Sequence, residues 1–323
     1  MKYDLTQARK CIETLDKRRF DRALLGSGDA FRHIVSLLPL LLHLNHSALP
    51  GYVEYAPVGI SDFILSNYQQ GFLSKEHPEL AASVQSAVNS DAVFAPILGI
   101  YVMGSFGSIS QTSASDLDIW ICHQDDLSEQ DQQRLAEKTK KITQWASTFH
   151  VEMHFYLMTQ KRFRNERYSD PLTKENSGSA QYMLLLEEFY RSAVRLAGKP
   201  LLWLHLWVED EKQYEAEVAR LVAEGELNPN DWVDFGGLGQ FSASEYFGAS
   251  LWQLYKGIDS PYKSVMKILL LETYAQEYPN AHLIARQFKE DLLSGRSTAA
   301  HHFDPYIAIL ERISQYLTTH SEF

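Results

Sequence analysis

Two acidic residues separated by one aliphatic residue, Asp116-Leu117-Asp118, carry the strongest chemical signal in the sequence. They begin an apolar run over residues 116–122 that is typical of a β-strand. Side chains alternate along a strand, so both carboxylates lie on one face while Leu117 points into an apolar layer. Neighbouring carboxylates repel each other, and a divalent cation with a preference for hard oxygen ligands relieves that repulsion. The pair therefore predicts a metal site.

A glycine-serine turn, Gly104-Ser105, precedes this pair by ten intervening residues. Gly104 and Gly107 allow backbone amides to approach a phosphate closely, and Ser105 adds a hydroxyl donor. A phosphate cradle beside a metal-binding pair is what phosphoryl transfer requires. Two metal ions ~3.5–4 Å apart can clamp the attacking and leaving oxygens.

A third carboxylate is expected from a second strand over residues 151–158, where Glu152 shares one face with His154 and Tyr156. An acid on an apolar strand needs a metal or a partner. We interpret His154 as a hydrogen-bonding neighbour. Asp-Leu-Asp alone is common in ordinary loops and strand ends, so the prediction depends on the whole combination.

At these residues the sequence resembles the DNA polymerase beta nucleotidyltransferase superfamily, whose signature is Gly-Ser followed by Asp-x-Asp and a later acid. It resembles more closely the catalytic region of the class I adenylate cyclases of gamma-proteobacteria. The longer matching stretches are far more specific than the short signature. They are residues 102–105, 115–123, 188–191, 196–199, 245–256 and 260–263.

The resemblance implies cyclisation of ATP to 3′,5′-cyclic AMP and pyrophosphate, by attack of the ribose 3′-oxygen on the α-phosphate. It implies that Asp116 and Asp118 hold two Mg²⁺ ions, with Mn²⁺ as an alternative. Glu152 would complete a metal site and help to deprotonate the 3′-hydroxyl, and Gly104-Ser105 would bind the triphosphate. Cyclases of this family are longer, with a C-terminal region linked to the sugar phosphotransferase system. Regulation by a phosphocarrier is expected only through that region.

A second phosphate-binding element is predicted where Ser260-Pro261 opens a helix, with Ser260 as N-cap. The N-terminus of a helix attracts anions. Lys263 and Lys267 are four residues apart and share a helix face, where a triphosphate would relieve their mutual repulsion. The alternative interpretation of these lysines is a solvated basic face.

Two other functions stay open at this point. One is an intermolecular nucleotidyltransferase that acts on an RNA, a protein or a small molecule. The net charge of −11 and the lack of a basic stripe argue against nucleic acid as a partner. The other is a truncated nucleotide-binding module without activity, against which the intact Asp-Leu-Asp motif and Glu152 argue.

Composition bounds the class of protein. The 323 residues are 45% hydrophobic and 22% charged, which excludes disordered, collagen-like and disulfide-scaffold chains. Only two cysteines occur, Cys11 and Cys122, which fits a reducing compartment. No apolar stretch approaches the ~20 residues of a membrane span, and no leader segment is visible. These features predict a soluble, cytoplasmic protein.

The predicted fold class is α+β, with a small mixed sheet as a polymerase beta-like nucleotidyltransferase core. We expect an N-terminal helical segment over 1–90, the catalytic core over 91–210 and a C-terminal helical domain over 211–323. Within the core, strands are predicted at 97–103, 116–122 and 151–158, a helix at 129–148, a helix at 180–196 and a last β-like run at 201–208.

Overall fold

A four-stranded mixed sheet forms the centre of the computed structural model, which describes residues 5–87, 95–113, 115–165, 182–294 and 303–320. The strand order is β3-β2-β1-β4. β2 runs antiparallel to β1 and parallel to β3, and β4 is antiparallel to the other edge of β1. The strands are β1 (Ile97–Met103), β2 (Leu117–His123), β3 (Met153–Met158) and β4 (Val194–Gly198).

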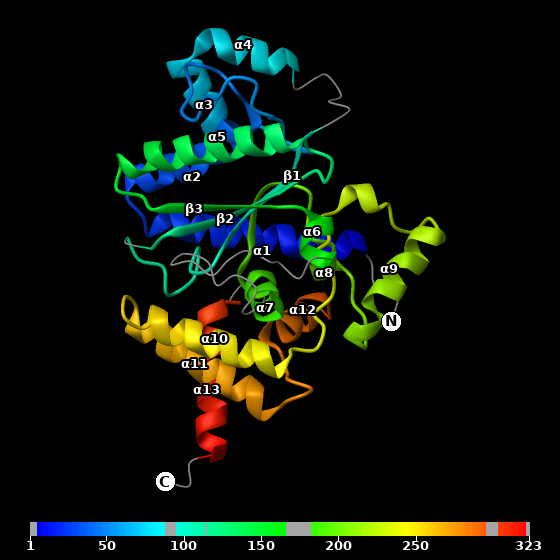
Figure 1. Cartoon of the computed structure of the whole chain (residues 1–323). Helices are drawn as coiled ribbons and strands as arrows, with labels where there is room; N and C mark the ends of the chain where they lie inside the picture. The colour runs from blue at the N-terminus through cyan, green and yellow to red at the C-terminus, as the bar shows by residue number, and fades with distance from the viewer. Residues whose placement is uncertain (1–4, 88–94, 114, 166–181, 295–302, 321–323) are drawn as a thin grey trace.

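One face of the sheet is covered by α2 and α5 (Figure 1). The alternation of β2 explains this, because Leu117, Ile119 and Ile121 all point into the core beneath these helices. Ser128 caps α5 by accepting a hydrogen bond from the Asp131 amide, as its sequence position predicts. The N-terminal helices are α1 (Leu5–Leu25), α2 (Asp29–His43), α3 (Asn67–Glu76) and α4 (Pro78–Ala87), and α5 spans Glu129–Ser147.

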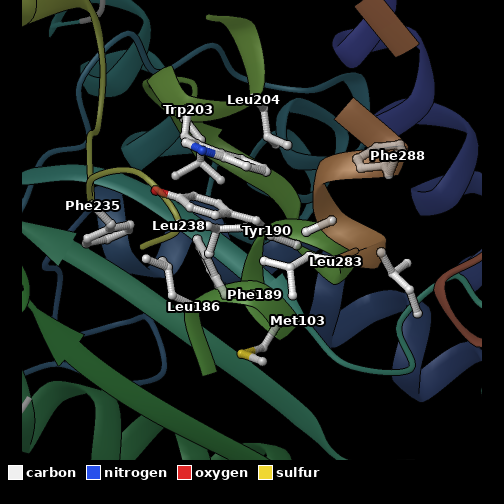
Figure 2. Packing of buried hydrophobic residues seen from close by; sticks show 14 of the residues in the cluster. Met103, Leu186, Phe189, Tyr190, Trp203, Leu204, Phe235, Leu238, Leu283 and Phe288 are labelled. Carbon is white, nitrogen blue, oxygen red and sulfur yellow. The ribbon is translucent and has the colours of Figure 1, made fainter. Parts of the chain in front are cut away.

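The opposite face carries an aromatic core built on the alternate residues of the same strands. Trp120 of β2 stacks on Phe189 with 4.0 Å between ring centroids. Tyr190 stacks on Trp203 at 4.3 Å, and Figure 2 shows these rings lying parallel. The helices below this face are α6 (Gln160–Asn165), α7 (Tyr182–Ser192), α8 (Leu202–His205), α9 (Tyr214–Ala223), α10 (Ala243–Lys256), α11 (Pro261–Gln276), α12 (Ile284–Leu293) and α13 (Pro305–His320), with 3₁₀ turns at Glu211–Gln213 and Pro229–Asp231.

The α+β class, the small mixed sheet and the helical C-terminal part are confirmed, and two predicted elements are wrong. The helix expected over 180–196 ends at Ser192, and its first two residues lie outside the described part of the chain. The chain then forms β4, because Val194 and Gly198 pair with the free edge of β1. The β-like run at 201–208 contains the helical turn α8 instead, closed by the Leu206 amide donating to the Leu202 carbonyl.

Helices from both ends of the sequence contribute to the aromatic core. Ile12 and Leu15 of α1 are buried there together with Ile309 of α13. The domain boundaries near residues 90 and 210 stay a prediction. Among the described residues, no helix combines the length and the apolar character that crossing a bilayer demands.

The loop between β1 and β2 is tied down by helices far away in the sequence. Arg19 of α1 donates to the Phe106 carbonyl at 3.0 Å. The Ile109 amide donates to Asp304 Oδ2 at 2.6 Å, and the same carboxylate pairs with Arg22. Asp304 directly precedes α13 and accepts the Tyr306 amide through Oδ1. One buried carboxylate therefore joins α1, the loop and α13.

Gly107 in this loop packs against the backbone of α1 and generates the first prediction. Its φ of +64° is the left-handed region, and an added Cβ would lie 2.3 Å from the Arg19 carbonyl oxygen. Gly107→Ala should therefore lower the free energy of unfolding by about 2–4 kcal/mol, from backbone strain plus overpacking. Urea denaturation measures this free energy.

Gly26→Ala is the matched control, because a Cβ there meets nothing within 4 Å. Its free energy of unfolding should stay within about 0.5 kcal/mol of the wild-type value. Equal effects of the two substitutions would show that the close approach of the loop to α1 does not determine stability.

Candidate active site

Strand register brings the predicted site residues together at one end of the sheet. Asp118 pairs with Met103 of β1 on one side and with His154 of β3 on the other. Gly104 follows Met103 directly, so the glycine-serine turn lies beside the acidic pair. A cavity of about 460 Å³ opens here between the sheet and the helices α10 and α11. All seven residues predicted from sequence line it, namely Gly104, Ser105, Asp116, Asp118, Glu152, Lys263 and Lys267.

The two aspartates differ in their surroundings. Asp116 is exposed just before β2, whereas Asp118 is partly buried within the strand. The Tyr156 hydroxyl donates to Asp118 Oδ1 at 3.3 Å. Burial, followed by the charge of Asp116, raises the pKa of Asp118 to about 6, although His154 and Lys267 oppose the shift. The ionised form of Asp118 is thus disfavoured, and a nearby cation would stabilise it.

Glu152 lines the cavity, but its carboxylate contacts His154 instead of the two aspartates. It precedes β3 by one residue instead of lying in the strand, and its side chain is 70% exposed. Its Oε1 is 3.1 Å from His154 Nε2. Within the described ranges, no three His, Cys, Asp or Glu side chains converge closely enough to hold a metal ion. The expected three-carboxylate cluster is therefore not preformed, because His154 engages Glu152.

The remaining pair still fits Mg²⁺. Magnesium in nucleotide sites is commonly held by one or two carboxylates, with substrate phosphates and water completing its shell. Among the described side chains that line the cavity, carboxylates outnumber lysine ammonium groups five to three. A triphosphate entering this cavity would meet net repulsion unless divalent cations accompanied it. The donor set and the charge balance both suit such a cation.

The glycine-serine turn has the predicted position but uses its amides differently. The Gly104 amide donates to Ser192 Oγ at 3.1 Å, and the Gly107 amide donates to Gln111 Oε1 at 2.6 Å. Neither amide is directed to a ligand, so these glycines serve the turn and its packing. The Ser105 hydroxyl has no hydrogen-bond partner in the part of the chain that the structure describes, and it lines the cavity.

The two lysines of α11 have different roles in the structure. Lys267 Nζ lies 2.8 Å from Glu188 Oε1 of α7. Burial opposes the charge on both groups, but their mutual attraction dominates and lowers the pKa of Glu188 while it raises that of Lys267. Lys263, one turn earlier, has no carboxylate within ion-pair distance among the described residues. Lys263 therefore offers an ammonium group to an anion in the cavity.

The start of α11 also departs from one prediction. The helix begins at Pro261 as expected, but the Ser260 side chain makes no capping hydrogen bond. Ser260, Lys263 and Ser264 all line the cavity. The positive end of the helix dipole therefore faces the cavity without a side-chain cap.

Sequence reasoning missed several residues that line the site. Glu188 carries no local signal, because its partner Lys267 is 79 positions away. Trp252, Gln253 and Tyr306 also line the cavity from α10 and α13. Tyr156 had a local signal, since it shares its strand face with His154, and Glu188, Trp252 and Gln253 lie within the stretches that carry the family resemblance.

The raised pKa of Asp118 predicts a pH-dependent stability. The protonated carboxyl favours the folded state below its ordinary pKa of 3.8, and this contribution is lost as pH rises through about 6. In metal-free buffer, Asp118→Asn should therefore be more stable than wild type by about 1–3 kcal/mol at pH 8, with the difference shrinking toward pH 4. Thermal melts across this range, in the presence of a chelator, measure the effect.

Asp126→Asn is the control, because Asp126 is exposed in the turn after β2 and does not line the cavity. Its melting temperature should follow that of wild type at each pH. An Asp118→Asn difference that does not change with pH would contradict the desolvation of this carboxylate.

Searches with known proteins place most of the chain in two family domains. Residues 4–204 match the adenylate cyclase NT domain, and residues 241–323 match the second domain of class-I adenylate cyclases. Among solved structures, spectinomycin adenyltransferase AAD(9) from Enterococcus faecialis aligns with a TM-score of 0.33 and 14% identity. That alignment covers 74% of this chain and 90% of that chain, and the likeness is too distant to support an argument.

Curated relatives match over all or nearly all of the chain. It is 66% identical to an adenylate cyclase of Haemophilus influenzae and 62% identical to one of Pasteurella multocida, with 100% of this chain aligned in each case. It is 45% identical to an adenylate cyclase of Escherichia coli K12 over 97% of its length. The chain spans only 39%, 38% and 36% of these three relatives. The chain belongs to the class-I adenylate cyclase family.

Proposed function

We propose that this chain is the catalytic part of an adenylate cyclase, which converts ATP to 3′,5′-cyclic AMP and pyrophosphate. The observation that carries the proposal is the convergence of all seven predicted site residues on one cavity. They come from the turn after β1, from the start of β2 and the residue before it, from the residue before β3, and from α11. The names of the relatives supply the reaction, because the fold alone does not specify a substrate.

Asp116 and Asp118 would hold Mg²⁺, for which two ions are expected, and Glu152 would complete one site. When bound, the metal supplies positive charge that offsets the triphosphate and favours departure of pyrophosphate. Tyr156 donates to Asp118 Oδ1 and so fixes the direction in which the other oxygen of that carboxylate points.

The other groups of the cavity act directly on the nucleotide. Lys263 and the Ser105 hydroxyl donate to the phosphates, and the uncapped start of α11 adds its dipole. Lys267 contributes charge from within its pair with Glu188. Glu152 accepts the proton of the ribose 3′-hydroxyl through a carboxylate oxygen, and His154 orients that carboxylate. The 3′-oxygen then displaces pyrophosphate in line at the α-phosphorus of the same molecule.

The proposal predicts that Asp118→Asn abolishes catalysis without unfolding the protein. Incubation of the chain with ATP and Mg²⁺ should yield cyclic AMP on chromatography. The variant should form cyclic AMP at least about 100-fold more slowly. It lacks a carboxylate that would hold the cation balancing the negative charge of the reacting phosphates. Asp126→Asn should retain the wild-type rate.

Two outcomes would redirect the assignment. Transfer of label from ATP to an added acceptor, without cyclic product, would favour an intermolecular nucleotidyltransferase. Binding of ATP with neither product would mean that this chain is a nucleotide-binding module.

A second prediction separates the two lysines of α11. Lys263→Ala should weaken ATP binding about 10- to 100-fold, because it removes a charge-assisted hydrogen bond to phosphate. Lys267→Ala should instead lower the free energy of unfolding by about 1–3 kcal/mol, because it leaves the part-buried carboxylate of Glu188 without its partner. Isothermal titration calorimetry and urea denaturation measure the two effects.

Lys140→Ala is the matched control, as Lys140 is exposed on α5 away from the cavity. It should change neither quantity. A stability loss for Lys263→Ala equal to that for Lys267→Ala would count against a division of roles between the lysines.

A further inference from the structure

The phosphate-binding groups account for one part of the cavity, and α10 lines another. Trp252 and Gln253 of α10 both line it, and neither has a role in the chemistry described above. We propose that Gln253 reads the nucleotide base, through paired hydrogen bonds from its carboxamide, and so distinguishes adenine from guanine. This inference rests on the proposed function, because it assumes that a nucleotide occupies the cavity.

The first support is the state of the Gln253 side chain. The residue is only 6% exposed, yet its carboxamide makes no hydrogen bond within the described part of the chain. A buried amide without partners costs free energy, and native proteins rarely leave one so. The carboxamide is not sealed in the protein interior either, because its unpaired oxygen and nitrogen atoms both keep some contact with solvent-accessible space. It therefore opens into the cavity.

Gln69 is a buried glutamine with a structural role, and it provides a comparison for Gln253. It is similarly buried, with 4% exposure. Its Nε2 donates to the Ser36 carbonyl at 2.9 Å, and its Oε1 accepts the Ser66 amide at 3.0 Å. Both ends of that carboxamide are satisfied by the protein. Gln253 has the same burial and neither bond, so its partners are expected to come from a ligand.

The chemistry of a carboxamide matches a base edge better than the other parts of a nucleotide. It presents one donor and one acceptor side by side, and adenine presents an amino donor next to an unprotonated ring nitrogen. Phosphates are bound most strongly by charged donors, and the cavity provides these on α11. Trp252, which is 8% exposed and lines the same cavity, adds an aromatic surface on which a base can stack.

Changing the hydrogen-bonding pattern of residue 253 provides the test. In Gln253→Glu the donor becomes an acceptor, which opposes the ring nitrogen of adenine but suits the two adjacent N–H groups of guanine. Gln253→Leu removes both bonds without adding charge. Calorimetric titrations of each protein with ATP, GTP and inorganic tripolyphosphate, all in Mg²⁺, separate base recognition from phosphate binding.

The ratio of ATP affinity to GTP affinity should fall about 10- to 100-fold in both variants relative to wild type. The larger change is expected for Gln253→Glu. Tripolyphosphate affinity of Gln253→Leu should stay at the wild-type value. Gln276→Glu, an exposed glutamine of α11 that donates to Glu272, is the matched control and should leave all three affinities unchanged.

An unchanged ATP-to-GTP ratio in both variants overturns the inference and leaves the proposed function standing. An equal loss of ATP and tripolyphosphate affinity in Gln253→Leu overturns it as well, because the residue would then serve the phosphates. Failure of the wild-type chain to bind either nucleotide refutes the proposed function and the inference together. Thermal melts identify a variant that has lost its fold, in which case the other variant decides.

Discussion

The partly buried carboxylate of Asp118, held beside Asp116, is the electrostatic constraint around which the site is arranged. Burial and the neighbouring negative charge both disfavour ionisation of Asp118. The surrounding groups act in the opposite direction: Tyr156 donates to it, and His154 and Lys267 lower its pKa. These groups come from β3 and α11, so the position of the aspartate depends on sheet register and on helix packing together. A cavity with such a charge balance is suited to a ligand that brings cations with it.

The ion pair between Lys267 and Glu188 is a second electrostatic interaction at the site, and it joins two helices. Glu188 lies on α7, against the aromatic core, and Lys267 lies on α11. Their ion pair fastens the C-terminal helices to the helix that packs under the sheet. Lys267 therefore joins α11 to α7, whereas Lys263, one turn earlier, lines the cavity without an ion-pair partner among the described residues and is proposed to bind a ligand.

The features that sequence predicts well here are those set by neighbours along the chain. Asp116 and Asp118 both line the cavity, although Asp116 lies just before β2, and Pro261 marks the start of α11. Sequence reasoning was least successful where a distant segment decides. Residues 194–198 form a strand because they pair with the free edge of β1. The Ser192 hydroxyl oxygen accepts a hydrogen bond from the Gly104 amide, 88 positions earlier in the sequence. The separation of Glu152 from the aspartates reflects a hydrogen bond to His154, which a spacing argument does not contain.

Asp304 joins the loop after β1 to the start of α13, across 195 positions of sequence. This separation orders events on the ribosome. The strands and the glycine-serine turn leave the exit tunnel long before residue 304 does, so at that stage α1 can already hold the loop through Arg19 while the contact from Ile109 to Asp304 is still missing. Tyr306 of α13 can join the lining of the cavity only after this helix has emerged. The proposed nucleotide site is therefore complete only once the chain has extended past α13.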